Sequence, residues 1–215
     1  MNSVLAVTGT RREASVLRNS GVTAIAIGGS GRALDDALVA HGGALAAILS
    51  FGMGGALGPD LRLGDWVIGT ALCGEGDAIC DEDWVATLSR QLPQARSGPC
   101  YADGRLIGNS DEKHAIYRKH GALVADMESH HVAHAAARLG IPFAILRCIS
   151  DEAGADLPPA ITVAMRPDGG LALGSILKSI LTNPAQLPAL MRCTARFNRA
   201  FASLEIGVSQ AFNQS

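Results

Sequence analysis

The 215-residue sequence predicts an α/β fold, a single-domain three-layer α/β/α sandwich with helices on both faces of a central sheet. Two observations support this prediction. Short apolar runs, typical of buried strands, alternate with helical segments along most of the chain. Apolar residues make up 48% of the sequence, which is enough to fill a large core. We expect one domain over 1–215, in which 170–215 form a helical C-terminal extension.

The first half of the chain predicts four strands and three helices. The strands are expected where apolar residues run together, at 4–7, 22–27, 45–51 and 66–69. The helices are expected at 11–19, 33–41 and 84–92. The first helix ends at Gly21 and the second at Gly42, and glycine is the usual residue after a helix. Residues 74–83 are acidic and contain glycine, so we expect a surface loop there.

The second half predicts strands at 123–125 and 143–146, and helices at 113–119 and 132–139. From residue 157 onward the pattern is mostly helical, and Pro184 and Pro188 are expected to separate two helices. Apolar residues recur at helical spacing in this tail, so we expect it to cover the core and contact a second copy of the chain. Contact with a lipid or a membrane surface is the alternative.

Composition excludes several classes of protein. The net charge is −2 and no basic run is present, so we expect no nucleic-acid partner. The five cysteines show no Cys-x-x-Cys spacing, which predicts a reduced protein without disulfides or a zinc site. The N-terminus does not resemble a signal peptide, and no apolar run reaches the roughly 20 residues that span a bilayer. We expect a cytoplasmic protein, and peripheral membrane contact stays open.

Histidines alone do not predict a metal. His130 and His134 are four residues apart, a spacing that metal ligands use on a helix. The His-Glu-x-x-His order of metalloproteases is missing. We therefore expect surface or packing roles for these side chains and no bound metal.

Acidic residues follow two of the predicted strands. One strand stops at Asp126-Met127-Glu128, and the strand at 143–146 leads to Ser150-Asp151. Ligands of α/β proteins usually bind at the carboxyl ends of strands, so these side chains predict a site. Glu128 has the chemistry to accept hydrogen bonds from a vicinal diol, and Asp151 in a dry cleft has that of a general acid. Asp126 is equally typical of a helix N-cap.

Two glycine-rich turns and one acidic turn add candidates. The turn at 28–32 ends a strand and opens a helix, where backbone N–H groups and Arg32 suit an anion, although tight turns also use glycine for steric reasons alone. It is neither a Walker loop nor a dinucleotide fingerprint. The turn at 50–57 would let a ligand approach the backbone or would simply bend the chain. Glu13 would orient a water or lie in a solvated helical turn.

Six motifs in a fixed order resemble the purine nucleoside phosphorylase and nucleosidase family over about residues 3–152. They are Glu13, Gly-Ser-Gly at 29–31, Gly-Met-Gly-Gly-Ala-Leu-Gly-Pro at 52–59, Leu-Gly-Asp-Trp-Val at 63–67, Asp-Met-Glu-Ser at 126–129 and Arg-Cys-Ile-Ser-Asp at 147–151. The resemblance implies a nucleoside phosphorylase-like mixed central sheet. The arginine-rich start, short middle region and helical tail are most similar to the hopanoid-associated branch, which is thought to remove adenine from adenosylhopane.

The resemblance implies a role for each candidate residue. Asp151 would protonate the purine N7, Glu128 would bind the ribose hydroxyls, and Glu13 would position water, as it does in the hydrolases of the family. An acid at the leaving group and negative charge near the sugar suit glycosidic cleavage. The residues implied to line the substrate pocket are Met127, Ser50, Gly52, Gly54 and Ser150.

The nucleophile stays open between water and phosphate. Phosphate would be held by Gly29, Ser30, Arg32, Arg11 and Arg12. Because the hydrolases carry acidic residues where this chain has two arginines before Glu13, the sequence favours phosphorolysis of adenosylhopane, with inorganic phosphate as co-substrate and no other cofactor. The alternatives are a hydrolytic nucleosidase for methylthioadenosine or adenosylhomocysteine, and a non-catalytic nucleoside-binding module. Family members imply a homo-oligomer, a dimer or a hexamer.

Overall fold

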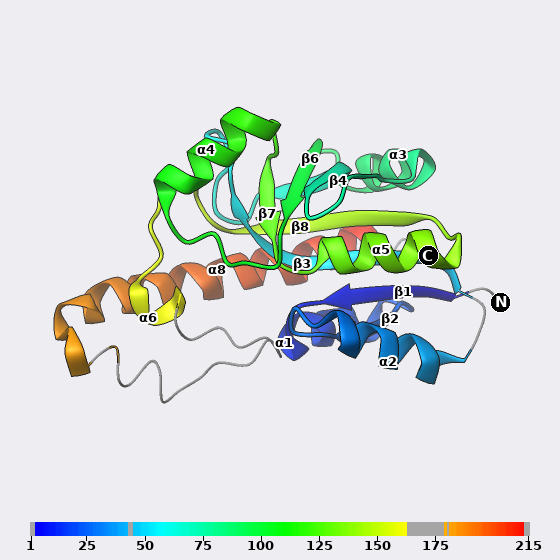
Figure 1. The fold of residues 1–215 in the computed structure, drawn as a ribbon, viewed down its shortest axis with the longest axis horizontal. Coiled ribbons are helices and arrows are strands. Elements are labelled where there is room, and N and C mark those ends of the chain that lie inside the picture. Colours follow the sequence, from blue (N-terminus) through cyan, green and yellow to red (C-terminus); the bar gives the residue numbers. More distant parts are fainter. Residues whose placement is uncertain (1–2, 43–44, 163–178, 180, 213–215) are drawn as a thin grey trace.

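The computed structural model describes residues 3–42, 45–162, 179 and 181–212 of the chain. Within these residues an eight-stranded sheet forms, with helices on both of its faces (Figure 1). The strands are β1 (Ser3–Thr8), β2 (Thr23–Ala26), β3 (Leu45–Ala56), β4 (Trp66–Gly74), β5 (Ala78–Ile79), β6 (Arg96–Ala102), β7 (Val124–Asp126) and β8 (Phe143–Asp151). The α-helices are α1 (Arg11–Val16), α2 (Gly31–His41), α3 (Glu82–Gln91), α4 (Ser110–His120), α5 (Ser129–Leu139), α6 (Pro159–Thr162) and α8 (Leu187–Phe212), with 3-10 turns at Leu17–Asn19 and Pro184–Gln186.

The sheet is mixed, as the resemblance implied. β3 is its central strand and pairs in parallel with β1 and β8. The last residues of β3 also pair antiparallel with β7. β8 in turn pairs antiparallel with β4, β4 pairs with β6, and β6 pairs with β7. The strands β3, β8, β4, β6 and β7 therefore close into a ring, from which β1 and β2 extend as an open edge.

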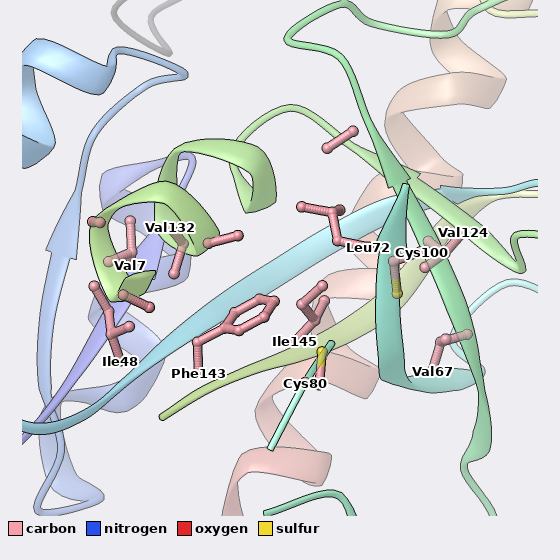
Figure 2. Packing of buried hydrophobic residues seen from close by; sticks show 14 of the residues in the cluster. Val7, Ile48, Val67, Leu72, Cys80, Cys100, Val124, Val132, Phe143 and Ile145 are labelled. Atoms are coloured by element: carbon pink, nitrogen blue, oxygen red, sulfur yellow. The ribbon is translucent and has the colours of Figure 1, made fainter. Parts of the chain in front are cut away.

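Alternate residues of the strands fill two separate apolar layers. On one face Val7, Ile48 and Ile145 pack with Val132 of α5, as Figure 2 shows. Successive side chains of a strand point to opposite faces, so the neighbouring residues belong to the other layer. Helix α2 joins α5 on this first face through Leu34.

The second face is covered mainly by α8 and α3. Phe201, Leu204 and Val208 of α8 pack on the sheet with Leu49 and Leu146. The helix comes very close to the sheet at one point, because a Cβ on Gly207 would overlap the indole ring of Trp66. The two covered faces confirm the predicted three-layer architecture.

Several element boundaries differ from the sequence predictions. β3 and β4 continue well past the predicted ends at 51 and 69, and β6 was not predicted. Pro188 lies in the first turn of α8, where proline is tolerated, and does not separate two helices. The predicted helical residues 170–178 lie outside the described residues. None of the described helices combines the length and the apolarity needed to cross a membrane.

Candidate functional site

Four buried charged side chains meet where β1, β3, β7 and β8 come together. Glu13 opens α1 directly after β1, Asp126 ends β7, and Glu128 follows it. Arg147 lies in the middle of β8, opposite Gly52 of β3. None of these side chains belongs to a residue with more than 8% exposure, and Arg147 is fully buried.

The Arg147 guanidinium holds this cluster together. Its Nη2 lies 3.1 Å from Asp126 Oδ1 and 3.8 Å from Glu128 Oε2. The same nitrogen donates to the hydroxyls of Ser50 and Ser129. Nε and Nη1 have no hydrogen-bond partner among the described residues. One buried cation thus serves three carboxylates, which leaves the cluster rich in negative charge.

Asp126 has a structural role at the start of α5. Its Oδ1 accepts hydrogen bonds from the backbone N–H groups of Glu128, at 2.8 Å, and Ser129, at 2.7 Å. Its Oδ2 accepts from the Ser129 hydroxyl at 2.6 Å. Burial alone would raise its pKa, but the charge of Arg147 and these hydrogen bonds hold the pKa of Asp126 below its usual value. The carboxylate therefore stays ionised.

Glu13 is held at the strand ends by a capping box. Its Oε2 accepts from the backbone N–H of Thr10 at 2.7 Å and from the Thr10 hydroxyl at 2.8 Å. Its Oε1 accepts from the backbone N–H of Met53 at 2.7 Å. Gly52 permits this approach, since a Cβ there would lie 2.6 Å from Glu13 Oε1. Glu13 is thus anchored over β3 and is not a solvated turn residue.

Glu128 shares its surroundings with Glu13. A Cβ on Gly9 would lie 2.7 Å from Glu128 Oε1 and 3.4 Å from Glu13 Oε2, so both carboxylates border this glycine. Burial raises the pKa of Glu128 to about 8, helped by the charges of Asp126 and Glu13 and opposed by Arg147. These surroundings make ionisation of Glu128 harder, and a positive charge nearby would favour it.

Asp151, the last residue of β8, marks the second part of the site and pairs with Gly55 of β3. Its Oδ1 accepts from the Ser150 hydroxyl at 2.7 Å, and its Oδ2 forms an ion pair with Lys113 of α4. A Cβ on Gly55 would lie 3.1 Å from Oδ2. Gly52 and Gly55 are three positions apart on β3, so their Cα atoms lie about 10 Å apart, with a register shift between Gly54 and Gly55.

Other predicted pocket residues lie around these groups in different ways. The hydroxyl of Ser50 is fully buried and bonded to Arg147 and Ser129, so its contact is with the protein. Gly54 lies against β7, where a Cβ would meet Val124 at 2.6 Å. Met127 is half-buried between Asp126 and Glu128. The roles of these residues toward a substrate remain predictions.

One of the three predicted phosphate-binding arginines, Arg12, is engaged with α8. The Arg12 guanidinium lies 3.9 Å from the centre of the Phe201 ring and donates to Asn198, so it contacts α8. Arg11 and Arg32 are exposed.

In the turn at Gly28–Ser30, Gly28 donates its backbone N–H to the Gly9 carbonyl oxygen and Ser30 donates to that of Ile27, both at 3.0 Å. Gly28 and Gly29 have φ values of 61° and 76°, and Ser30 caps α2. His131 lies 3.1 Å from the Gly29 carbonyl oxygen through Nε2.

Sequence reasoning missed Lys113. The chain predicts a helix there, and Lys113 shares its buried face with Ile116, three residues on. A lysine at an apolar-face position was the available signal. Among the described residues, no group of three or more His, Cys, Asp or Glu side chains is arranged to hold a metal ion.

The site can be set beside proteins of known family. A family model described as the Phosphorylase superfamily matches residues 4–181. The chain belongs to this superfamily. Its order of motifs and its mixed sheet agree with that membership, whereas the hopanoid-associated branch stays a prediction.

One curated relative matches less than half of this chain. The chain is 33% identical over 93 residues to a 5'-methylthioadenosine/S-adenosylhomocysteine nucleosidase from Treponema pallidum, a match that covers 43% of this chain and 31% of that protein. The chain thus spans about a third of the length of this curated relative.

Solved structures share the fold at low identity. A Helicobacter pylori 5'-methylthioadenosine/S-adenosylhomocysteine nucleosidase is similar with a TM-score of 0.64 and 16% identity, over 85% of this chain and 99% of that one. A futalosine hydrolase from the same organism is similar with a TM-score of 0.63 and 17% identity, over 84% and 97%. A putative methylthioadenosine nucleosidase from Weissella paramesenteroides is similar with a TM-score of 0.63 and 21% identity, over 99% and 98%.

Proposed function

We propose that this protein cleaves the N-glycosidic bond of a purine nucleoside by hydrolysis, on a substrate of the methylthioadenosine or adenosylhomocysteine type. The observation that carries the proposal is the pair of buried carboxylates, Glu13 and Glu128, that border Gly9. One anchored carboxylate beside a second is suited to activating water next to a sugar. The Treponema relative, a nucleosidase by name, supports the same reaction class.

Each carboxyl group has a distinct task in this reaction. Asp151 gives a proton to N7 of the purine while the bond between N9 and the sugar breaks, so the base leaves as a neutral molecule. Glu128 binds the ribose hydroxyls, and its charge stabilises the developing positive charge on the sugar. Glu13 takes a proton from the water whose oxygen bonds to the anomeric carbon. Met127 supplies an apolar contact to the sugar.

Phosphorolysis is the second candidate, with adenosylhopane as the substrate that the sequence favours. The observation in its favour is the turn at Gly28–Ser30, whose backbone opens the N-terminus of α2, a typical anion site. The contact of Arg12 with α8 takes one of the three arginines away from this role. A lipid-linked nucleoside would find exposed apolar side chains at Leu181, Leu187 and Met191.

Release of adenine with and without phosphate tests the proposal. We expect the purified protein to release adenine from methylthioadenosine in phosphate-free buffer, with free sugar as the second product. Glu13→Gln can keep the capping box through its amide oxygen, while its NH2 group replaces the oxygen that accepts from the Met53 N–H. It should lower kcat by roughly 10²–10⁴-fold, the usual contribution of a general base.

Arg32→Gln is the matched control, and it should leave hydrolysis unchanged. Release that requires phosphate, yields a sugar phosphate and is lost in Arg32→Gln would establish phosphorolysis instead. Tight nucleoside binding with no release by the wild-type protein would support the non-catalytic binding module.

A further inference from the structure

We propose that Lys113 is a positioning residue that fixes Asp151 and stabilises the carboxylate left after proton transfer to the base. The inference rests on the proposed function, since it assigns a partner to the acid of that reaction. Lys113 is fully buried on α4, far in sequence from the other site residues.

All three N–H groups of the Lys113 ammonium have acceptors. One forms the ion pair with Asp151 Oδ2, and the others donate to the carbonyl oxygens of Glu152, at 3.2 Å, and Ala155, at 3.0 Å. Burying an ammonium is costly unless it is paired and hydrogen-bonded, and these three acceptors offset that cost. Lys113 therefore has one defined position.

The ion pair removes the rotational freedom of the Asp151 carboxyl group. Lys113 holds Oδ2, and Ser150 Oγ lies 2.7 Å from Oδ1, the oxygen that carries the transferable proton in the acid form of Asp151. Ser150 also reaches the Gly54 carbonyl oxygen at 3.2 Å, which ties the pair to β3. A proton donor fixed in this way needs no reorganisation when the purine arrives.

The charge of Lys113 acts on the chemical step itself. As the O–H bond of Asp151 breaks and the N–H bond at N7 forms, the electron pair of the glycosidic bond passes to the purine. The carboxylate that remains lies against the ammonium, which stabilises it. Burial raises the pKa of the Cys193 thiol of α8, and the nearby charge of Asp151 adds to this shift, while Arg196 and Lys113 oppose it. Hydrogen bonds from Ser110 lower the pKa of the exposed Asp156, and Lys113 adds to that shift.

The same ammonium connects Asp151 to the loop that follows it. The loop residues 152–155 line a cavity of about 380 Å³ together with Pro59, Arg62, His114 and Arg196. A change in this loop would therefore be transmitted to the carboxylate through Lys113. The alternative is that Lys113 only holds this loop in place. The experiment must distinguish that role from an effect on Asp151.

The test compares pH profiles of purine release in wild type, Lys113→Met, Lys113→Arg and Asp151→Asn. A limb is a rising or falling part of the curve of rate against pH. The limb that is present in the wild type and absent in Asp151→Asn reports the ionisation of Asp151. In Lys113→Met we expect that limb to move to higher pH by about one unit or more, because a buried carboxyl without its cation holds its proton longer. We expect kcat to fall by roughly 10²-fold, KM to change little, and Lys113→Arg to restore the limb. A folded Lys113→Met protein with the wild-type profile and kcat would overturn the proposal.

A second measurement needs no change at Lys113. The ¹⁵N resonance of its ammonium in the wild-type protein should show a titration step at the pH of the Asp151 limb, and this step should be absent in Asp151→Asn. No such step in the wild type would overturn the role of Lys113. Wild-type protein that releases no purine under any condition would overturn the proposed function instead.

Discussion

Glu128 is a carboxyl group that the fold keeps from ionising easily. It lies among Asp126, Glu13 and Arg147, where one cation faces three acids. A substrate whose sugar becomes positively charged in the transition state would change that balance and favour the ionised form. The residue is thus suited to bind the transition state more tightly than the substrate.

The raised pKa of Glu128 predicts how stability depends on pH. Between about 4.5 and about 8 the folded protein keeps a proton that the unfolded chain has released, so this group lowers stability as pH rises through that window. Glu128→Gln removes the effect. We expect the variant to gain, relative to wild type, about 1 kcal/mol or more of unfolding free energy between pH 5 and pH 8. Urea unfolding at both values measures it.

Glu205→Gln, on the exposed side of α8, is the control and should show no gain between the two pH values. The raised pKa would be contradicted if the difference in unfolding free energy between wild type and Glu128→Gln were the same at pH 5 and pH 8.

At the scale of elements, α8 covers one face of the sheet with several apolar side chains. Its backbone comes very close to the sheet at Gly207. Gly207 lies on the indole ring of Trp66, and a Cβ there would overlap it. Alanine favours a helix over glycine by about 1 kcal/mol, so propensity and packing make opposite predictions at this position. Packing should decide, because the aromatic ring is itself buried in the core.

We therefore expect Gly207→Ala to lower the free energy of unfolding by about 1–3 kcal/mol, as overpacking of a core does. Gly154→Ala is the matched control, because a Cβ at Gly154 meets nothing within 4 Å, and its effect should stay within about 0.5 kcal/mol. Denaturant unfolding measures both. A stabilised Gly207→Ala protein would show that α8 docks differently.

The elements that were predicted well are those with a clear apolar pattern. Strands such as β1 and helices such as α5 follow their periodicity. β3 was predicted too short because Gly52, Gly54 and Gly55 are typical of a turn, whereas here they let neighbouring side chains and β7 pack against a continuing strand. β6 has little apolar alternation and forms only because β4 and β7 pair with it.

The candidate site was predictable where strand ends carry acidic residues. Glu13, Glu128 and Asp151 were identified in this way, and the structure places Glu13 beside Glu128. Lys113 and the pairing of Arg147 with Asp126 were not predicted, because α4 and β8 come near these acids only through the tertiary fold. The contact of Arg12 with α8 likewise depends on how that helix packs. Assembly into a dimer or hexamer stays a prediction.

At the scale of the whole molecule, the ring formed by β3, β8, β4, β6 and β7 brings distant segments to one strand edge. Residues from α1, α4, the start of α5 and the end of β8 contribute to the site. The superfamily membership explains the order of these segments.

A crystal structure of Glu13→Gln soaked with methylthioadenosine tests the central claim most directly, because the variant should bind the nucleoside without cleaving it. We predict the ribose hydroxyls within hydrogen-bond distance of Glu128 and the purine N7 within the same distance of Asp151. A nucleoside bound elsewhere, or bound with its base away from Asp151, would contradict the account.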